Sequence, residues 1–270
     1  MDHRRISIVV PVYGDWQSLS LNIKALKKSI GRWSKDQVYF INDCGPDVDM
    51  LEAKIKSEIV GRKNFHYYRN DKNIGFLKNC NNAVFSIINP KHDVLLLNSD
   101  AIVTKGFLKQ MQKTLYAEEN IGAVCPRSNS ATIFSIPMHQ DFTRPVTMKE
   151  SYDFYKKIKN SLPIYYISPI AHGFCIMLRR EVIDKFGLFD EVYGKGYGEE
   201  NDLCMRIRDK GWVCAVTNRA YVYHYGSKSF GVEKRKMYID KNEAILLNRY
   251  PRFREIIAEY VSRINEPHLD

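Results

Sequence analysis

Apolar residues in the first 100 positions alternate between short unbroken runs and longer stretches in which they recur every three or four positions. Unbroken β-branched and aromatic runs predict buried strands, whereas the three-to-four spacing predicts helices. Regular alternation of the two predicts an α/β fold, a parallel sheet with helices on both faces. The strands are expected at residues 5–13, 37–43, 65–70 and 93–100, and the helices at 19–30, 51–59 and 75–88.

The pattern changes after residue 120. Five prolines between residues 121 and 175 interrupt short apolar pieces, which predicts loops and mixed strands. We find no internal repeat and no low-complexity linker, so we expect one domain at residues 1–230 and a helical C-terminal tail at residues 231–270. Later elements are expected as a helix at 181–186, a strand and loop at 220–230, and charged helix from Val232 to Ile264.

The composition is that of an ordered globular protein, with 44% hydrophobic and 27% charged residues among 270. A net charge of +10 predicts an anionic partner, such as nucleic acid, an acidic membrane surface or a phosphorylated small molecule. No nucleic-acid-binding motif accompanies the charge, so no nucleic-acid partner is expected. The first residues lack a signal-peptide pattern and the six cysteines form no CxxC pair, which favours a cytoplasmic protein with reduced thiols.

Polar residues follow each of the four predicted strands. In open α/β sheets ligands bind at the carboxyl ends of the strands, so these residues are expected to line one crevice. A single cluster of Asn, Asp and Gly also ends a strand as ordinary turn chemistry, but four in succession favour a ligand site. The clusters are Pro11-Val12-Tyr13, Asn42-Asp43, Asn70 to Asn73, and Asn98-Ser99-Asp100.

Asp100 is the most informative of these residues, because it closely follows a buried strand. A lone carboxylate there is costly unless it is paired or bound to a metal. Mg²⁺ or Mn²⁺ bridging this carboxylate and a diphosphate would suit it, since both ions favour oxygen ligands. The chain has no GxxxxGK[ST] loop and no GxGxxG after its first strand, which excludes P-loop chemistry and disfavours dinucleotide oxidoreduction.

Seven segments of the chain occur in the order seen in one enzyme family. They are SIVVPVYG, INDCGPD, NIGFLKNCN, LLLNSD, GFCIMLRREVIDKFGLFDE, GYGEENDLCMR and VYHYGSKSF, which together extend over about residues 5–230. On these segments the chain resembles bacterial family-2 glycosyltransferases, most closely those that build surface polysaccharides such as O-antigen. The resemblance implies the GT-A fold, a Rossmann-like, mostly parallel sheet flanked by helices.

The resemblance places nucleotide contacts at the strand ends. The base and ribose fall on Pro11, Val12 and Tyr13, and Asn42 stands where the family often has an acid near the base, with Asp43 beside it. An amide can still bond a pyrimidine edge, so the identity of the base stays open. The remaining matched positions are Asn73, Gly75 and Lys78 after the third strand and Asn98 and Ser99 after the fourth.

For the metal, the resemblance implies Asp100 as the usual ligand and His224, in the late segment VYHYGS, as a further contact. An imidazole beside one carboxylate favours Mn²⁺ over Mg²⁺ modestly. Lys78 would offset diphosphate charge, although a solvated helix lysine is an equally good interpretation.

Three acids, Glu199, Glu200 and Asp202, stand between the segment GKGYG and a predicted helix. The resemblance implies that Glu200 is the general base that takes the acceptor hydroxyl's proton in an inverting transfer. Glu199 is expected to face the donor or the loop, and Asp202 to cap the helix and hold the loop or the acceptor. Acids at a helix N-terminus are also stabilised by its dipole, by about 0.3–1 kcal/mol each. Clustering of the acids should raise one carboxyl pKa.

The expected activity is therefore metal-dependent, inverting transfer of a hexosyl or related sugar from a nucleotide-diphosphate donor, by preference UDP-linked, to a hydroxyl of a glycan or lipid-linked acceptor. The alternatives are a nucleotidyltransferase, whose glycine-rich basic loop is missing after the first strand, and a non-catalytic carbohydrate-binding protein, which need not keep the acids.

Basic residues of the tail suit an anionic membrane surface or a lipid-diphosphate acceptor, and a solvated helix face is the other interpretation. We accordingly expect a cytoplasmic enzyme with possible peripheral contact at the inner face of the cytoplasmic membrane. The residues are Lys228, Lys234, Arg235, Lys236, Arg249, Arg252 and Arg254.

Overall fold

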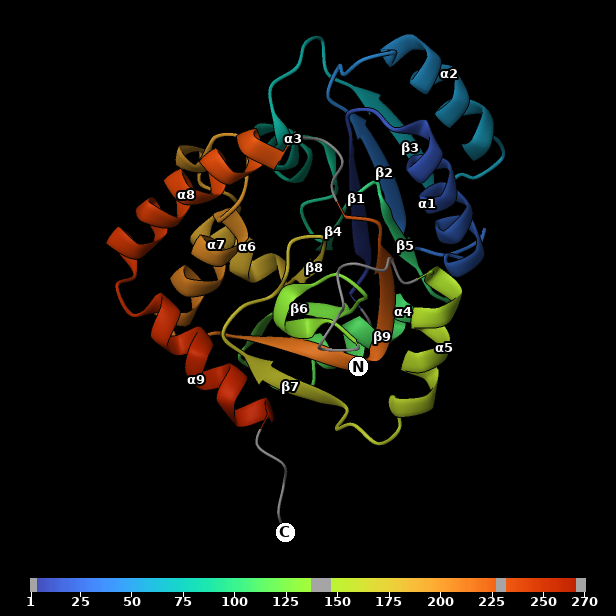
Figure 1. Cartoon of the computed structure of the whole chain (residues 1–270). Coiled ribbons are helices and arrows are strands. Elements are labelled where there is room, and N and C mark those ends of the chain that lie inside the picture. Colours follow the sequence, from blue (N-terminus) through green and yellow to red (C-terminus); the bar gives the residue numbers. More distant parts are fainter. Residues whose placement is uncertain (1–3, 137–146, 227–231, 266–270) are drawn as a thin grey trace.

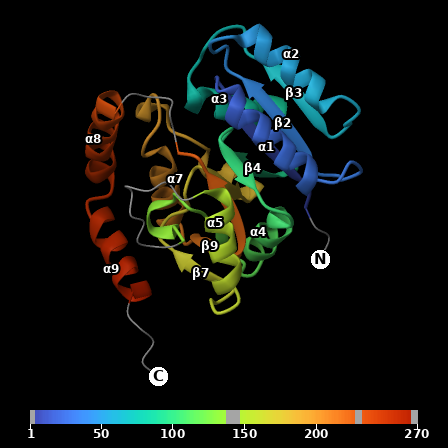
Figure 2. The same ribbon diagram turned by 45° about the vertical axis from the view of Figure 1, so that its right-hand side comes forward.

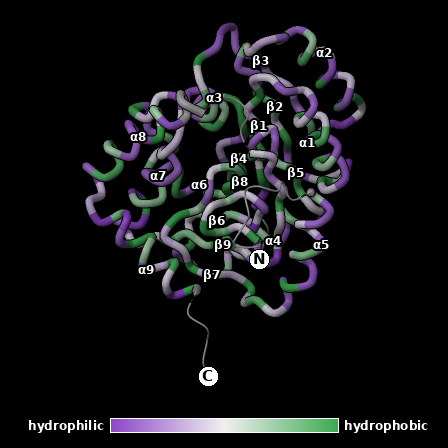
Figure 3. Tube along the Cα trace, viewed as in Figure 1, coloured by the Kyte–Doolittle hydropathy of each residue, from purple (hydrophilic) through white to green (hydrophobic). Residues whose placement is uncertain are grey.

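The computed structural model describes residues 4–136, 147–226 and 232–265 of the chain, and in its last part the side chains of 236–264. Within these ranges the chain folds around one sheet of nine strands. Helices surround the sheet (Figure 1). Apolar positions gather along the central strands, whereas the outer helices present many hydrophilic positions (Figure 3).

The first half of the chain folds as the sequence predicts. Each expected strand and helix is present, and its bounds lie within a few residues of those expected. The third helix continues as a π-helical turn, Ala83–Ile87. The elements are β1 (Ile6–Val12), α1 (Trp16–Ser29), β2 (Gln37–Asn42), α2 (Val48–Ile59), β3 (Phe65–Arg69), α3 (Phe76–Asn82) and β4 (Asp93–Leu97).

The second half contains the expected mixed strands and two helices that were not expected, at Phe107–Leu115 and Met148–Ile158. The second of these, α5, begins at a capping box: the Glu150 N–H donates to the Thr147 hydroxyl, and the Thr147 N–H donates to the Glu150 carboxylate. The elements are β5 (Ala101–Val103), α4 (Phe107–Leu115), β6 (Ile121–Arg127), α5 (Met148–Ile158), β7 (Tyr165–Ser168), β8 (Cys175–Leu178), α6 (Arg180–Phe186), α7 (Glu199–Arg208), β9 (Val213–His224), α8 (Val232–Arg249) and α9 (Phe253–Asn265).

The order of the strands creates a switch point in the sheet. The order is β3-β2-β1-β4-β8-β6-β9-β5, with β7 also paired to β9. The first four of these strands are parallel, and the chain moves outward from β1 to β3 and then returns to add β4 on the other side of β1. Right-handed crossovers therefore place α1 and α2 on one face and α3 on the other (Figures 1 and 2). Ligands bind where such a reversal separates the carboxyl ends of neighbouring strands, here β1 and β4.

Strand β4 is buried along its whole length, and β1 along nearly all of it. Burial on both faces explains why these strands read as unbroken apolar runs rather than as an alternating pattern. Strand β9 is longer than expected, because it begins at Val213 and crosses the polar segment TNR. Its Asn218 amide donates to the Pro163 carbonyl, a long-range bond that a local pattern does not reveal.

The C-terminal helices α8 and α9 pack against the rest of the protein. Leu246 and Phe253 are buried in a cluster with Met205 of α7, and the Tyr260 ring lies 6.2 Å from that of Phe134. Among the described residues, no helix combines the length and the apolar character needed to cross a membrane.

Candidate active site

The turn that follows β4 carries the predicted segment NSD, and a buried side chain from α1 holds it. The Asn22 amide donates hydrogen bonds to the carbonyls of Asn98 (3.2 Å) and Ala101 (2.7 Å). The Asn98 N–H donates to the Phe174 carbonyl at 2.9 Å. Contacts from two other elements thus fix the backbone on which the Asp100 side chain stands.

The register of the sheet brings His224 beside Asp100. Strands β5 and β9 pair antiparallel with Ala101 opposite His224, and His224 Nε2 lies 3.4 Å from Asp100 Oδ1. The imidazole stacks on the Phe174 ring, with centroids 5.0 Å apart, and its Nδ1 lies 3.2 Å from the Ser130 carbonyl oxygen. Because a carbonyl only accepts, Nδ1 carries the proton, and in the neutral ring Nε2 presents a lone pair.

Asp100 and His224 fit a divalent metal ion. The Nε2 atom is buried and has no hydrogen-bond partner, and a lone pair next to a carboxylate oxygen is unfavourable unless a cation lies between them. Carboxylate oxygen and imidazole nitrogen are both ligands that Mn²⁺ accepts. In the described part of the chain, no three His, Cys, Asp or Glu side chains gather as a metal site. Phosphate oxygens and water would therefore have to complete the coordination.

The loop before α7 brings Glu200 to the same region. Glu200 packs against Gly173, where a methyl group would lie 3.4 Å from Glu200 Cδ. Gly173 precedes Phe174, whose ring stacks on His224. One short segment of chain therefore contacts both the predicted base and the predicted metal ligand.

Glu199 is buried and Glu200 is partly exposed, and Oε2 of each lies sealed from solvent without a hydrogen-bond partner. Burial raises the pKa of Glu200, and burial followed by the charge of Glu200 raises the pKa of Glu199 well above its usual range. The expectation of a raised carboxyl pKa is thus confirmed, with desolvation as its main cause. A carboxylate of raised pKa is a better proton acceptor near neutral pH.

Glu199→Gln is expected to stabilise the folded protein at neutral pH. The raised pKa means that the folded state binds the proton more tightly than the unfolded state does. This tighter proton binding contributes its full share to the free energy of unfolding below the pKa of the carboxyl group in the unfolded state, about 4.3. The contribution is lost as the pH rises through the pKa in the folded state. Glutamine removes the buried charge, so the free energy of unfolding at about pH 8 should rise by about 1 kcal/mol.

Thermal unfolding at about pH 4 and about pH 8 measures this effect, since the gain should vanish at the lower pH. Glu119→Gln, at an exposed position, is the matched control and should change stability at neither pH. A Glu199→Gln protein that is less stable than the parent at the higher pH contradicts the prediction.

Asp202 does not cap α7, so that expectation is wrong. Gly198 occupies the N-cap position, and the Asp202 side chain is 1% exposed inside the structure. Its Oδ1 accepts hydrogen bonds from the Tyr193 hydroxyl (3.2 Å) and from Arg249 Nη1 (2.8 Å), and its Oδ2 lies 3.2 Å from Arg206 Nη2. Asp202 therefore contributes through these paired charges rather than through a cap.

The carboxylate of Asp43, at the end of β2, holds the segment that precedes α3. It accepts hydrogen bonds from the backbone N–H groups of Ile74 and Gly75 and from the Asn70 amide, each at 2.9 Å. Asn73 is exposed within that segment, and Gly75 is the N-cap of α3. Asp43 thus fixes the backbone of the segment that contains the predicted nucleotide contacts Asn73 and Gly75.

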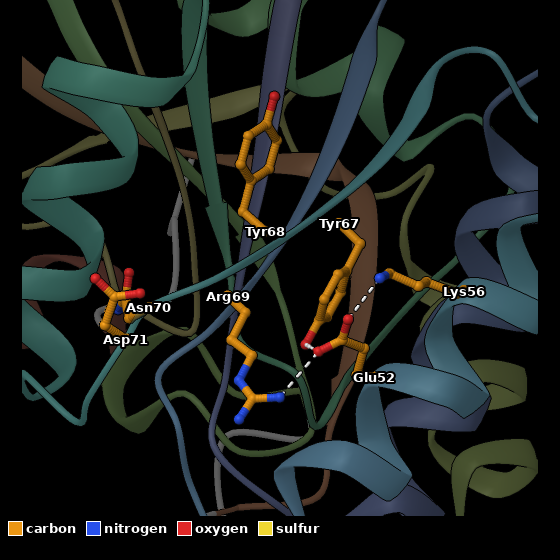
Figure 4. A pocket seen from close by; sticks show the side chains of 7 residues that line it. All are labelled: Glu52, Lys56, Tyr67, Tyr68, Arg69, Asn70 and Asp71. Carbon is orange, nitrogen blue, oxygen red and sulfur yellow. Dashed lines mark hydrogen bonds and ion pairs between the residues drawn. The ribbon is translucent and has the colours of Figure 1, made fainter.

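A cavity of about 530 Å³ lies beside the end of β3 (Figure 4). Asn42 adjoins it, because its amide nitrogen donates to the Tyr67 hydroxyl at 3.1 Å. The Asn42 Oδ1 atom is buried without a hydrogen-bond partner. The cavity is lined by Glu52, Lys56, Tyr67, Tyr68, Arg69, Asn70 and Asp71.

The Tyr13 side chain at the end of β1 is half exposed and available for stacking on a base. Gly45 permits its position, because a Cβ atom there would lie 1.6 Å from the Tyr13 carbonyl oxygen. Lys78 forms an exposed ion pair with Glu191, their charged atoms 3.5 Å apart, which favours its interpretation as a solvated helix lysine.

Several residues that shape this region were missed in the sequence. Asn22 had a recognisable signal, a polar residue on the apolar face of a predicted helix. Gly173 stood in a segment interpreted as core and loop, and Arg69 lay at the end of a strand without any motif. Their proximity to the site arises from contacts between distant elements, so spacing alone does not reveal it.

Three solved structures illustrate what this chain resembles. GalNAc-T7 with UDP, GalNAc and Mn²⁺ has a TM-score of 0.67 and 14% identity, over 93% of this chain and 51% of that one. The mannosyltransferase PcManGT from Pyrobaculum calidifontis, with GDP-Man and Mn²⁺, has a TM-score of 0.66 and 15% identity, over 93% of this chain and 65% of that one. TarS 1–349 of S. aureus has a TM-score of 0.55 and 16% identity, over 92% and 73% of the two chains.

This chain spans 51% and 65% of the first two structures, and at these identities the likeness shows the fold. No curated protein sequence matches the chain significantly. The model of Glycosyl transferase family 2 matches residues 7–187, which is most of the predicted catalytic domain. The match and the fold together decide against the nucleotidyltransferase and the non-catalytic alternatives. The chain belongs to glycosyl transferase family 2 and has the GT-A fold.

Proposed function

We propose that this enzyme transfers a sugar with inversion from a UDP-linked donor to a hydroxyl of a glycan or lipid-linked acceptor, in bacterial polysaccharide biosynthesis. The observation that carries the proposal is the Glu200 carboxyl group, whose Oε2 atom is buried without a hydrogen-bond partner and whose side chain packs on the segment that stacks on His224. A general base must lie within hydrogen-bond reach of the acceptor hydroxyl whose proton it takes, and the pKa of Glu200, which burial raises, suits this residue to that step.

Glu200 performs the proton transfer. Its ionised carboxylate takes the proton of the acceptor hydroxyl while the hydroxyl oxygen forms a bond to the anomeric carbon. The bond from that carbon to the diphosphate oxygen breaks at the same time, and the electron pair leaves with the nucleoside diphosphate. Direct displacement of this kind inverts the configuration at the anomeric carbon.

Asp100 and His224 are the residues that would hold Mn²⁺ or Mg²⁺. The ion would stabilise the negative charge on the departing diphosphate when bound. Two solved relatives of this fold contain Mn²⁺ together with a nucleotide or nucleotide sugar, which supports this assignment. The Asn22 amide keeps the backbone around Asp100 in place for this purpose.

The donor is assigned to the crevice between β1 and the cavity at the end of β3. Tyr13 would stack on the base, and the unpaired Asn42 carbonyl oxygen would accept a hydrogen bond from it. Uracil carries an N–H donor at its pairing edge, which suits this acceptor, and we therefore favour UDP. Glu200, in the first turn of α7, would face the acceptor.

A peripheral membrane contact remains a prediction from the basic tail. The structure uses three of the predicted basic residues in ion pairs: Arg249 with Asp190 and Asp202, Arg252 with Glu255, and Arg254 with Glu243. Lys236 is exposed. Lys228 and the side chains of Lys234 and Arg235 lie outside the described residues.

A hydrolysis screen tests the proposed donor. The protein is incubated with UDP-, dTDP- and GDP-linked sugars, each with Mn²⁺ and with EDTA, and released nucleotide is measured. We expect turnover of a UDP-sugar that requires Mn²⁺. Preference for a GDP-sugar would contradict the assignment of the base, and equal turnover in EDTA would contradict the assignment of the metal.

A further inference from the structure

The loop that delivers Glu200 has an unusual backbone. Gly194, Gly196, Tyr197 and Gly198 have φ values of 63°, 107°, 71° and 118°. Glycine adopts such angles readily, but Tyr197 does not, and a residue held there needs support from the surrounding structure. The segment 190–202 therefore depends on contacts from outside the loop.

Helix α8 supplies these contacts, and it runs beside α7 in both views (Figures 1 and 2). The buried Asn242 side chain donates from Nδ2 to the carbonyl oxygens of Tyr193 (2.8 Å) and Gly196 (2.7 Å). Both hydrogens of this amide are therefore directed at the backbone of the loop. The Tyr193 carbonyl also accepts from the Gly196 N–H within the loop (3.3 Å), so Asn242 adds bonds from outside to the backbone at both residues.

Arg249 joins the two ends of the same loop. Its Nη1 atom lies 2.9 Å from Asp190 Oδ2 and 2.8 Å from Asp202 Oδ1, and its guanidinium carbon lies 5.8 Å from the centre of the Tyr193 ring. Asp190 precedes the glycines and Asp202 follows the two glutamates. About two helical turns separate Asn242 from Arg249, so both side chains lie on the same face of α8. That face therefore contacts the middle of the loop through Asn242 and its two ends through Arg249.

We propose that Asn242 and Arg249 are positioning residues for glycosyl transfer, which hold the loop 190–202 so that Glu200 stays packed on Gly173. The inference rests on the proposed role of Glu200 and extends the active site to a helix that lies outside the matched family region. Neither residue needs to touch the substrate. A displacement of the base by about 1 Å is enough to slow a transfer by up to about 10²-fold.

The test uses full-length Asn242→Ala, Arg249→Ala and Arg249→Lys proteins. The controls are Asn248→Ala, an exposed asparagine on α8, and Arg263→Ala, an exposed arginine on α9. Hydrogen exchange of residues 190–202 reports on the loop, and steady-state kinetics with the nucleotide sugar from the screen report on catalysis. Each control should match the parent protein in both measurements.

We expect at least about 10-fold faster exchange in segment 190–202 for both alanine variants, with the exchange of β1 and β4 unchanged. The kcat should fall about 10–100-fold, while KM for the donor changes by less than about 3-fold. Arg249→Lys can keep one ion pair and should recover part of kcat. If Asn242→Ala does not fold, Arg249→Lys and Arg249→Ala are compared instead. The proposal then requires slower loop exchange and a higher kcat in the lysine variant than in the alanine variant.

Unchanged exchange in the loop would overturn the proposal, and so would faster exchange with a normal kcat. A rise in KM at normal kcat would assign these residues to donor binding instead, which also contradicts it. Absence of turnover in the parent protein would count against the proposed function, whereas hydrogen exchange would still decide whether α8 holds the loop.

Discussion

Glu200→Gln is expected to lower the rate of glycosyl transfer by about 10²–10⁴-fold and to leave the affinity for UDP nearly unchanged. Glutamine keeps the shape of the side chain but cannot take the proton of the acceptor hydroxyl. The site should otherwise remain intact, because Oε2 of Glu200 has no hydrogen-bond partner to lose. Initial rates with the donor from the screen and calorimetric titration with UDP measure the two quantities.

The pH dependence provides a second check on the same residue. Burial raises the pKa of Glu200, and a general base works only when ionised. The rate of the parent enzyme should therefore fall as the pH decreases through this raised pKa, and that limb should be missing from the residual activity of Glu200→Gln.

Glu199→Gln is the matched control for Glu200→Gln, because the two acids are neighbours in the first turn of α7 and the Oε2 atom of each is buried without a hydrogen-bond partner. It should reduce transfer less. Near-normal transfer by Glu200→Gln, together with loss of activity in folded Glu199→Gln or Asp202→Asn, would show that another acid is the base. Activity in all three variants would contradict the mechanism.

Removal of the divalent metal is expected to weaken UDP binding at least about 10-fold, since even outer-shell groups of metal sites affect affinity by about 10–100-fold. We expect this because Asp100 Oδ1 and His224 Nε2, the two predicted metal ligands, lie 3.4 Å apart and Nε2 has no hydrogen-bond partner. Calorimetric titration of UDP in Mn²⁺ and then in EDTA measures the change without any need for an acceptor.

Asp100→Asn and His224→Ala should reproduce the loss in the presence of Mn²⁺, and Asp100→Asn should have the larger effect because it removes the anionic ligand. Asp153→Asn is a suitable control, since that aspartate pairs with exposed lysines on α5. Equal UDP affinity in Mn²⁺ and EDTA would contradict the metal assignment.

The fold of the first 100 residues follows from local pattern, and the reason is physical. Strands such as β4 are buried on both faces, so their sequences must be continuously apolar, and the intervening helices bury one stripe each. Right-handed crossovers then restrict the order of the strands. The polar ends of β1, β2 and β4 could for this reason be assigned to one crevice before the structure was known.

Other features of the site and fold were found only through the family resemblance, or were missed or misassigned in the sequence. The segment VYHYGS pointed to His224 through the family resemblance, whereas the pairing of β5 with β9 is what places it next to Asp100. The capping box of α5 was readable in the sequence as T-x-x-E but lay in a region interpreted as loops and strands. Asp202 looked like a helix cap because acids favour the first turn.

The sequence by itself determined the order of strands and helices in the first 100 residues and the cluster of acids in the first turn of α7. The tertiary structure alone decided what those acids do. Arg249 stands 47 residues after Asp202, and only the packing of α8 against α7 turns a basic tail residue into the partner of a buried carboxylate. Burial likewise set the raised pKa values of Glu199 and Glu200, because desolvation depends on all the atoms that surround a carboxyl group.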